Sequence, residues 1–171
     1  MESEARLRPA GMEDAELILE WVNDPLDRAN SYNSDPIGLE EHLAWMERSL
    51  ADPGVHLYMM EVDGECAGHI KLYVSDGEAE IGYCIGPEWR GRGLAKVIVA
   101  LMTIETAEGL PEVSRLVGWV KEANVASRKA FLRTGYSEEG PRDGSYLYRF
   151  DIADYPANKE LLEGAAQVRR R

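Results

Sequence analysis

The most informative stretch of this chain is Arg90-Gly91-Arg92-Gly93-Leu94-Ala95. An alternating, strand-like run at 78–85 precedes it, and an apolar run with helical spacing follows at 94–107. A glycine-rich turn that opens a helix leaves backbone N–H groups unpaired, and the helix dipole adds positive potential there. Glycine lets these amides approach an anion without an intervening side chain. The turn therefore predicts a site for a phosphate or pyrophosphate, although plain chain reversal can use the same residues.

The turn differs from the two commonest nucleotide-binding signatures. A P-loop requires Lys-Ser/Thr after its last glycine, whereas Leu94-Ala95 stand here. A Rossmann turn requires three spaced glycines and an acidic residue further along. The neighbouring elements must therefore decide which cofactor binds.

Composition excludes several classes of protein. The 171 residues, 44% of them hydrophobic, predict one globular domain with a sizeable core. A formal net charge of −12 argues against nucleic-acid binding, which rests on neutralising phosphates, but suits a cationic substrate or simply solubility. No apolar run approaches the roughly 20 residues that span a bilayer. The N-terminus lacks the apolar segment of a signal peptide, so we expect a cytoplasmic protein without a membrane partner.

Cysteine and histidine spacing indicates no metal site. Cys66 and Cys84 lie in separate strand-like segments without metal or redox spacing, which favours reduced, buried thiols. The three histidines, His42, His56 and His69, show no ligand spacing either.

The periodicity predicts an α+β fold. We expect helices at 13–23, 39–50, 94–107 and 125–134, and strands at 5–8, 56–62, 66–74, 78–85, 115–120, 137–140 and 145–151. The segment 28–37 is polar and turn-rich. The order predicts a mixed sheet of about seven strands flanked by about four helices. The domain is expected to span 1–151, and 152–171 forms a tail whose segment 156–168 has helical character.

This order of elements, with the turn at 90–95, resembles the GNAT superfamily of acyl-CoA-dependent N-acetyltransferases. The family turn is Gln/Arg-x-x-Gly-x-Gly/Ala, and Arg90 to Ala95 fit every fixed position. A second segment, Val120 to Tyr136, is similar to the family's strand–Asn–helix–Gly-aromatic sequence. Two motifs in the right order are more specific than either alone, and the resemblance covers most of the chain.

The resemblance implies acetyl-CoA as cofactor, with its acetyl group passing directly to a primary amine in a ternary complex. The strands at 78–85 and 115–120 splay apart in this family and leave backbone groups for the pantetheine arm. The pyrophosphate would sit on the amides from Gly91 to Lys96, and Asn124 would contact the pantetheine while capping the next helix. The residues expected at the cofactor are Ile81, Tyr83, Cys84, Ile85, Arg90, Gly91, Arg92, Gly93, Leu94, Ala95, Lys96, Asn124, Ser127 and Phe131.

Amine acetylation needs a base, because an ammonium has no lone pair. Glu80 is the expected base, since family members use this strand for that purpose, and Glu78 on the same strand face is the reserve. The acid is open, because many relatives carry Tyr where this chain has Phe131, which has no proton to give. We name Tyr136 as the catalytic candidate, with Tyr83 and water as alternatives.

The N-terminal third resembles a narrower group, the acetyltransferases that modify nucleotide-linked 4-amino sugars in pseudaminic-acid-type pathways. The resemblance rests on Asn23-Asp24-Pro25, on 30–37 and on 39–45. The polar side chains suit a sugar, and the residues expected at the acceptor are Arg28, Tyr32, Asn33 and His42.

Other acceptors stay open at this point. Arg28, Arg48 and Lys71 could meet a diphosphate, whereas the strong acidity fits a polyamine or an aminoglycoside. The amine of a protein N-terminus is a further alternative acceptor. The alternative to an enzyme is a non-catalytic module that binds acyl-CoA. The oligomeric state is open as well, with a homodimer as one option.

Overall fold

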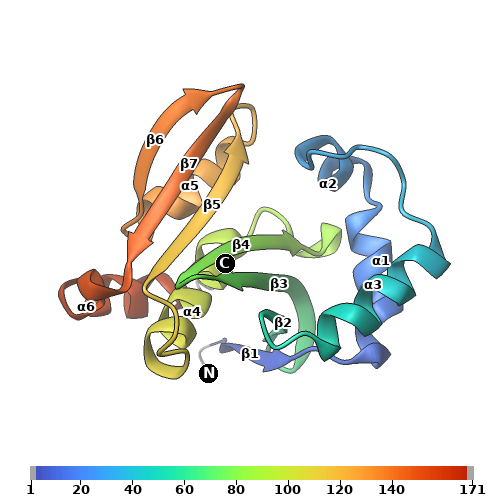
Figure 1. Ribbon diagram of the computed structural model, residues 1–171, viewed down its shortest axis with the longest axis horizontal. Coiled ribbons are helices and arrows are strands. Elements are labelled where there is room, and N and C mark those ends of the chain that lie inside the picture. Colours follow the sequence, from blue (N-terminus) through green and yellow to red (C-terminus); the bar gives the residue numbers. More distant parts are fainter. Residues whose placement is uncertain (1–2, 169–171) are drawn as a thin grey trace.

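A seven-stranded mixed sheet forms the centre of the protein, in the order β1-β2-β3-β4-β5-β7-β6 (Figure 1). The structure is a computed structural model that describes residues 3–168. Neighbouring strands are antiparallel, except that β4 and β5 are parallel. The strands are β1 (Ala5–Pro9), β2 (Val55–Val62), β3 (Glu65–Ser75), β4 (Glu78–Ile85), β5 (Arg115–Lys121), β6 (Ser137–Arg142) and β7 (Ser145–Asp151). The predicted α+β fold with a mixed sheet is confirmed.

Six α-helices lie within residues 3–168, two more than the four expected. They are α1 (Ala15–Val22), α2 (Pro25–Asn30), α3 (Leu39–Ala51), α4 (Leu94–Gly109), α5 (Val125–Arg133) and α6 (Tyr155–Ala165). The additional ones are α6, in the tail where the sequence has helical character, and α2, in a stretch that we expected to be irregular.

The short helix α2 begins where the sequence indicated only the end of α1. The Asp24 carboxylate accepts a hydrogen bond from the Leu26 N–H at 3.1 Å, and Pro25 occupies the first helical position. An acidic N-cap followed by proline is a start signal for a helix, because proline lacks an N–H that would otherwise need a partner. Asp24-Pro25 therefore both ends α1 and begins α2, a helix of six residues.

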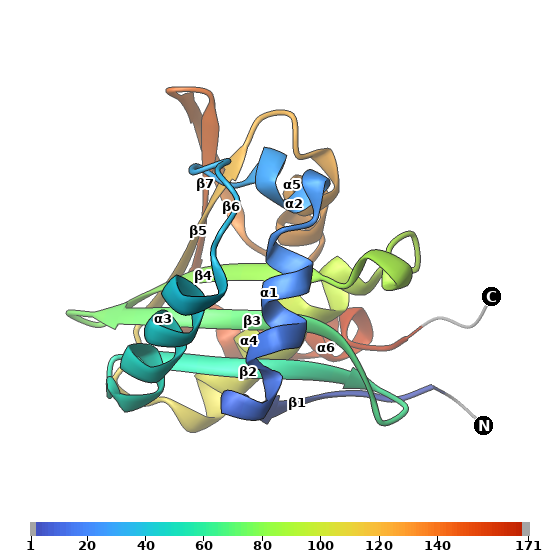
Figure 2. The same ribbon diagram turned by 90° about the vertical axis from the view of Figure 1, so that its right-hand side faces the viewer.

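Helices cover both faces of the sheet. On one face α4 and α5 pack on a core that includes Ile70, Ile98 and Leu116. On the other face α1 and α3 pack with β2 on a second core that includes Trp21 and Met46. Figure 2 shows α1 and α3 in front of β2–β4, with α4 behind these strands. Because successive side chains of a strand point to opposite faces, each side chain of β3 and β4 points either towards α4 and α5 or towards α1 and α3.

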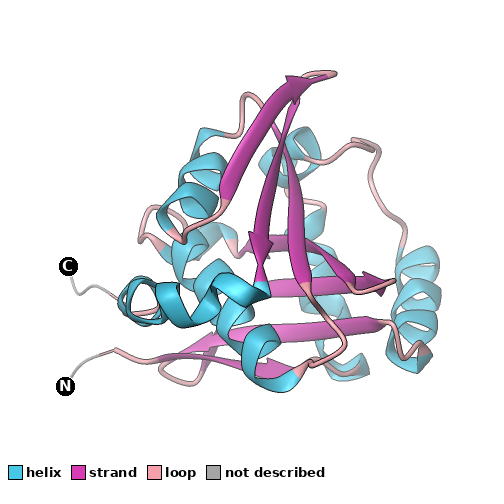
Figure 3. Ribbon diagram, turned by 60° about the vertical axis from the view of Figure 1, so that its left-hand side comes forward, coloured by secondary structure: helices cyan, strands magenta, loops and turns pink. Residues whose placement is uncertain are grey.

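The sheet divides between β4 and β5. These two strands pair only at Glu78↔Arg115, Ala79↔Leu116 and Glu80↔Val117. Beyond that point β5 pairs with β7 along its whole length, and β4 continues with β3 as its partner. Figure 3 shows β5, β7 and β6 rising away from the other strands. The splayed central pair is therefore present.

The C-terminal segment packs on the rest of the protein. Leu162 and Ala165 of α6 are buried in the same core as α4. The expected tail at 152–171 thus contains a docked helix, and its last residues, 169–171, lie outside the described part of the chain.

Candidate functional site

The glycine-rich turn has the backbone geometry of an anion site. Gly91 and Gly93 both have φ of +75°, a left-handed conformation that favours glycine. Gly93 is the N-cap of α4 and has no side chain to cap the first amides of the helix. A Cβ built on Gly93 would meet no atom within 4 Å, so the space in front of these amides is open. The turn therefore fits a phosphate group in front of the N–H groups that open α4.

The two arginines of the turn are held beside it. Arg90 Nη2 lies 2.7 Å from Asp24 Oδ2, which ties the turn to the start of α2. The Arg92 guanidinium lies 4.8 Å from the centre of the Trp89 ring, a cation–π contact. Leu94, in contrast, is buried in the core and contributes only its backbone to the turn. Positive charge therefore lies near the amides, in addition to the helix dipole.

The free edge of β4 provides the second half of a cofactor site. From Ile81 to Ile85 this strand has no partner in β5, because the pairing ends at Glu80↔Val117. Unpaired strand N–H and C=O groups need partners, and an extended amide-bearing arm supplies them. The short 3-10 helix Pro87–Trp89 joins this edge to the glycine turn, so both belong to one stretch of chain, 81–93. Amides for a pyrophosphate and a strand edge for pantetheine fit acetyl-CoA.

A hydrogen bond between two side-chain hydroxyls joins β4 to α5. Tyr83 Oη donates a hydrogen bond to Ser127 Oγ at 2.8 Å. Burial raises the pKa of Tyr83 to about 12, so its hydroxyl keeps the proton at neutral pH. Asn124 caps α5, since its Oδ1 accepts from the Ser127 N–H at 3.3 Å. The structure thus brings Tyr83, Ser127 and Asn124 together on the cofactor side of β4.

Cys84 lies on the same strand but is no nucleophile. Its side chain is buried, and burial raises the pKa of the thiol to about 12. A thiolate is therefore absent at neutral pH.

Tyr136 and Phe131 are core residues, which corrects their predicted roles. The Tyr136 side chain is buried, its ring lies 5.0 Å from that of Phe131, and its hydroxyl lies 2.6 Å from Thr103 Oγ1 inside α4. Burial raises the pKa of Tyr136 further above its usual range. Phe131 fills the space over Gly118, where an added Cβ would lie 2.6 Å from its ring. Neither side chain reaches the open surface, so Tyr136 is removed as the acid and Phe131 as a cofactor contact.

Glu80 occupies the vertex of the splay. It is the last residue of β4 that pairs with β5, between Tyr73 of β3 and Val117 of β5. Its side chain is exposed and, within the described residues, forms no ion pair. Glu78 is engaged instead, with its Oε2 3.9 Å from Arg115 Nη1. Alternation places Glu80 on the α1–α3 face, opposite to Tyr83. Its role as base stays a prediction.

Two of the four residues expected at the acceptor have structural roles. His42 is buried, and its Nε2 lies 2.8 Å from the Ala15 carbonyl oxygen, which joins α3 to α1. Arg28 donates to the Asn33 carbonyl oxygen at 2.9 Å and to that of Asp35 at 3.2 Å. Arg28 therefore holds the loop after α2 in place, and His42 does not reach an acceptor.

The other two lie in the loop itself. Asn33 is exposed, and its Oδ1 accepts from the Asp35 N–H at 3.0 Å. Tyr32 is 66% exposed, and its hydroxyl donates to Ser145 Oγ of β7 at 2.8 Å. Tyr32 thus stays available as a contact surface for an acceptor, although its hydroxyl is already bonded.

Two charged residues near the splay escaped the sequence analysis. Lys121 donates from Nζ to the Ser31 carbonyl oxygen at 2.6 Å and to that of Ala29 at 3.1 Å, which fastens α2 to β5. Asp27 lies on α2, and burial raises the pKa of its carboxyl to about 6. The signal that could have found Asp27 is Asp24-Pro25, because it starts the helix on which this carboxylate stands.

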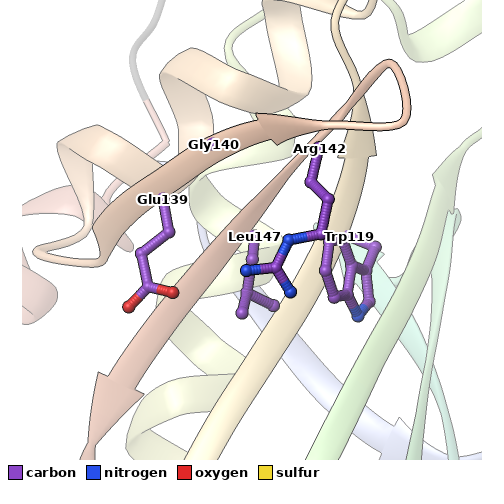
Figure 4. A pocket seen from close by; sticks show the side chains of 5 residues that line it. All are labelled: Trp119, Glu139, Gly140, Arg142 and Leu147. Atoms are coloured by element: carbon purple, nitrogen blue, oxygen red, sulfur yellow. The ribbon is translucent and has the colours of Figure 1, made fainter.

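A hollow lies on the face of β5, β6 and β7 from which Lys121 projects, and the sequence did not predict it. It is lined by Trp119, Glu139, Gly140, Arg142 and Leu147. In Figure 4 the Trp119 ring, the Leu147 side chain and the Arg142 guanidinium lie next to one another. Trp119 stands two residues before Lys121 on β5 and is 37% exposed. Strand alternation places Trp119 and Lys121 on one face of β5. Lys121 Nζ also lies 5.8 Å from the centre of the Tyr32 ring in the loop after α2, so Trp119 and Tyr32 are two aromatic side chains on this side of the protein.

Within residues 3–168, no group of three or more His, Cys, Asp or Glu side chains could hold a metal ion. None of the helices in that range is long and apolar enough to cross a membrane.

Comparison with known proteins points to acetyltransferases, in agreement with a site that fits acetyl-CoA. The Acetyltransferase (GNAT) domain family matches residues 5–137. The L-amino acid N-acetyltransferase AaaT of Escherichia coli (strain K12) is 27% identical over 120 residues, 64% of this chain and 74% of the relative.

Solved structures share the fold at low identity. Spermidine N-acetyltransferase from Vibrio cholerae, solved with CoA and spermine, has a TM-score of 0.80 at 17% identity, covering 90% of this chain and 98% of that one. Aminoglycoside acetyltransferase AAC(6')-Ib with coenzyme A has a TM-score of 0.77 at 18% identity, covering 91% and 99%. With an open strand edge, a glycine turn and a family match over most of its length, this chain belongs to the GNAT family of acetyl-CoA-dependent N-acetyltransferases.

Proposed function

We propose that this protein acetylates a primary amine of a small molecule, and that transfer takes place in a ternary complex at the vertex of the β4–β5 splay. The observation that carries the proposal is the free strand edge at 81–85, which is followed along the chain by the left-handed glycines at 91 and 93. Acetyl-CoA, when bound, supplies an activated thioester. The chain itself supplies binding, orientation and proton handling.

Proton handling is divided between the two faces of β4. Glu80, on the α1–α3 face, accepts the proton that the amine must lose before it can attack. Tyr83, on the opposite face, holds a proton at its Oη, 2.8 Å from Ser127 Oγ. The raised pKa of Tyr83 keeps that proton in place at neutral pH, so it is available to the CoA thiolate that leaves as the amine nitrogen forms its bond to the acetyl carbon. The amine therefore approaches from the side of α1, α2 and α3, and the cofactor from the side of α4 and α5.

Two acceptors are candidates. The sequence of the N-terminal third favours a nucleotide-linked amino sugar, but two residues on which that idea rested, Arg28 and His42, have structural roles. The Escherichia coli relative is named an L-amino acid N-acetyltransferase, which favours a free amino acid as the second candidate. The spermidine and aminoglycoside enzymes share the fold only. A homodimer and a cytoplasmic location stay predictions.

A turnover assay tests the proposal. The protein is incubated with acetyl-CoA and a panel of amino acids, nucleotide-linked amino sugars, spermidine and kanamycin, and released CoA thiol is measured. We expect amine-dependent release, with the acetylated amine identified by mass spectrometry. Calorimetric binding of acetyl-CoA with no amine-dependent release would instead favour a non-catalytic acyl-CoA-binding module.

A further inference from the structure

Lys71 places an ammonium without an anionic partner on the acceptor-side face of the sheet. It lies on β3 opposite Gly82 of β4, where an added Cβ would lie 2.8 Å from Lys71 Cε, so the glycine makes room for the lysine. Lys71 Nζ lies 5.2 Å from the centre of the Trp45 ring and 5.6 Å from that of Tyr73. Among the described residues no carboxylate forms an ion pair with it. Aromatic faces hold the cation in place and leave its N–H groups unused.

Asp27 places a carboxylate on α2, the helix whose N-cap Asp24 is bound to Arg90. Its side chain is 19% exposed, and its ion-pair contact is a long one, 3.8 Å to Arg28 Nη2. In the part of the chain that the structure describes, no hydrogen bond reaches this carboxylate. Burial raises its pKa to about 6, against the opposing charges of Arg28, Arg90 and Lys71. Burial removes water from this carboxylate, and no protein group within residues 3–168 donates a hydrogen bond in its place. A ligand that brings N–H groups would therefore stabilise its charged form.

Lys71 and α2 both lie beside the second half of β4. Lys71 stands opposite Gly82, and Asp24, the N-cap of α2, lies 2.7 Å from Arg90 in the turn that follows β4. The pKa of the Cys84 thiol is raised mainly by burial, and the charge of Asp27 raises it further while that of Lys71 lowers it. Cys84 faces the core between α1, α3 and the sheet, which is the acceptor side. Asp27 on α2 and Lys71 on β3 therefore place opposite charges beside the stretch of β4 whose edge the cofactor is expected to occupy.

We infer that Asp27 and Lys71 together select the acceptor, and that the acceptor is an amine that also carries an anionic group. The inference rests on the acetyl transfer proposed above. Asp27 accepts hydrogen bonds from the incoming ammonium, and Lys71 donates to the anionic group. Each charge of the site is then paired. A polycation such as spermidine leaves Lys71 facing a like charge, so it is rejected by repulsion as well as by a missing contact.

Two sources share this chemistry. An α-amino acid offers a carboxylate close to its amine, and a nucleotide-linked amino sugar offers phosphates further away. Matched pairs of compounds separate the two sources. L-alanine, L-methionine and L-phenylalanine are each compared with their amides, which keep the amine and lose only the carboxylate. A UDP-linked 4-amino sugar is compared with the same amino sugar without UDP.

The experiment measures kcat/KM by CoA release and binding by calorimetry in the presence of CoA. For at least one pair, the parent protein is expected to prefer the anionic member by roughly tenfold or more, the effect of one charged hydrogen bond. Lys71→Met should remove that preference by weakening the anionic member alone. Asp27→Asn should weaken both members of the pair. Lys159→Met, on the exposed side of α6, is the matched control and should change neither.

Several outcomes overturn the inference. Equal use of both members in every pair, or a preference for spermidine, contradicts it. A Lys71→Met variant that lowers both members equally shows that Lys71 only supports the fold. If no amine releases CoA, the proposed acetyl transfer fails, but calorimetry still decides this inference through the preference of the parent and its loss in Lys71→Met.

Discussion

Replacing Gly93 with valine tests the cofactor site most directly. At its φ of +75° a side chain with a Cβ is strained by roughly 1–2 kcal/mol. No atom lies within 4 Å of an added Cβ, so the variant should fold. Its isopropyl group would then stand between a phosphate and the amides that open α4. Loss of two charged hydrogen bonds at about 1.5–3 kcal/mol each weakens acetyl-CoA binding by about a hundredfold or more.

Calorimetry with acetyl-CoA measures this effect, and Gly64→Val is the control. Gly64 lies in the β2–β3 turn with φ of +86°, and a Cβ there also meets no atom within 4 Å. Both variants should lose about 2–8 °C in Tm from the same backbone strain. Only Gly93→Val should lose affinity. Parental affinity in a folded Gly93→Val protein would refute the assignment of the pyrophosphate to this turn.

Three further predictions concern proton handling and stability. Glu80→Gln should lower kcat roughly 10²- to 10⁴-fold and recover partly at high pH, where free amine is plentiful; an unchanged pH–rate profile would exclude Glu80 as the base. Tyr136→Phe should lower the free energy of unfolding by about 1 kcal/mol, measured in urea, because a buried hydroxyl contact is lost, while kcat stays within about twofold. His69 is buried, and burial lowers its pKa to about 3, with Lys71 lowering it and Asp14 raising it. The unfolded chain, whose histidine has a pKa of about 6.5, binds the extra proton first, so stability should fall as pH drops from about 6.5 towards 3, and His69→Gln should flatten that part of the urea-midpoint profile.

Elements with strong periodicity were predictable from the sequence. The alternation of β4 gave its bounds, Glu78–Ile85, and the apolar run after Gly93 gave α4. The helix α2 was missed because six residues are too few for a 3.6-residue period to show. Its start signal, Asp24-Pro25, is present in the sequence but directly follows the helix expected at 13–23.

The site was predictable where it consists of backbone, and less so where it consists of side chains. The glycine turn and the splayed edge of β4 follow from motifs that lie along one stretch of chain. Tyr136 and His42 were misplaced because their depth depends on residues far away in sequence, Thr103 of α4 and Ala15 of α1. Asp27 and Lys71 stand on different elements, α2 and β3, so no spacing in the sequence connects them.

The helix α2 has a mechanical consequence for the divided sheet. Within residues 3–168, three residue pairs between β4 and β5 are the only strand pairing between the two halves of the sheet. The first end of α2 is bound to the turn after β4 by Asp24 and Arg90, and the carbonyl groups at its other end are bound by Lys121 of β5. A six-residue helix therefore links the two halves of the sheet beyond the point where their strands separate, and we expect it to limit the width of the gap in which thioester and amine must meet.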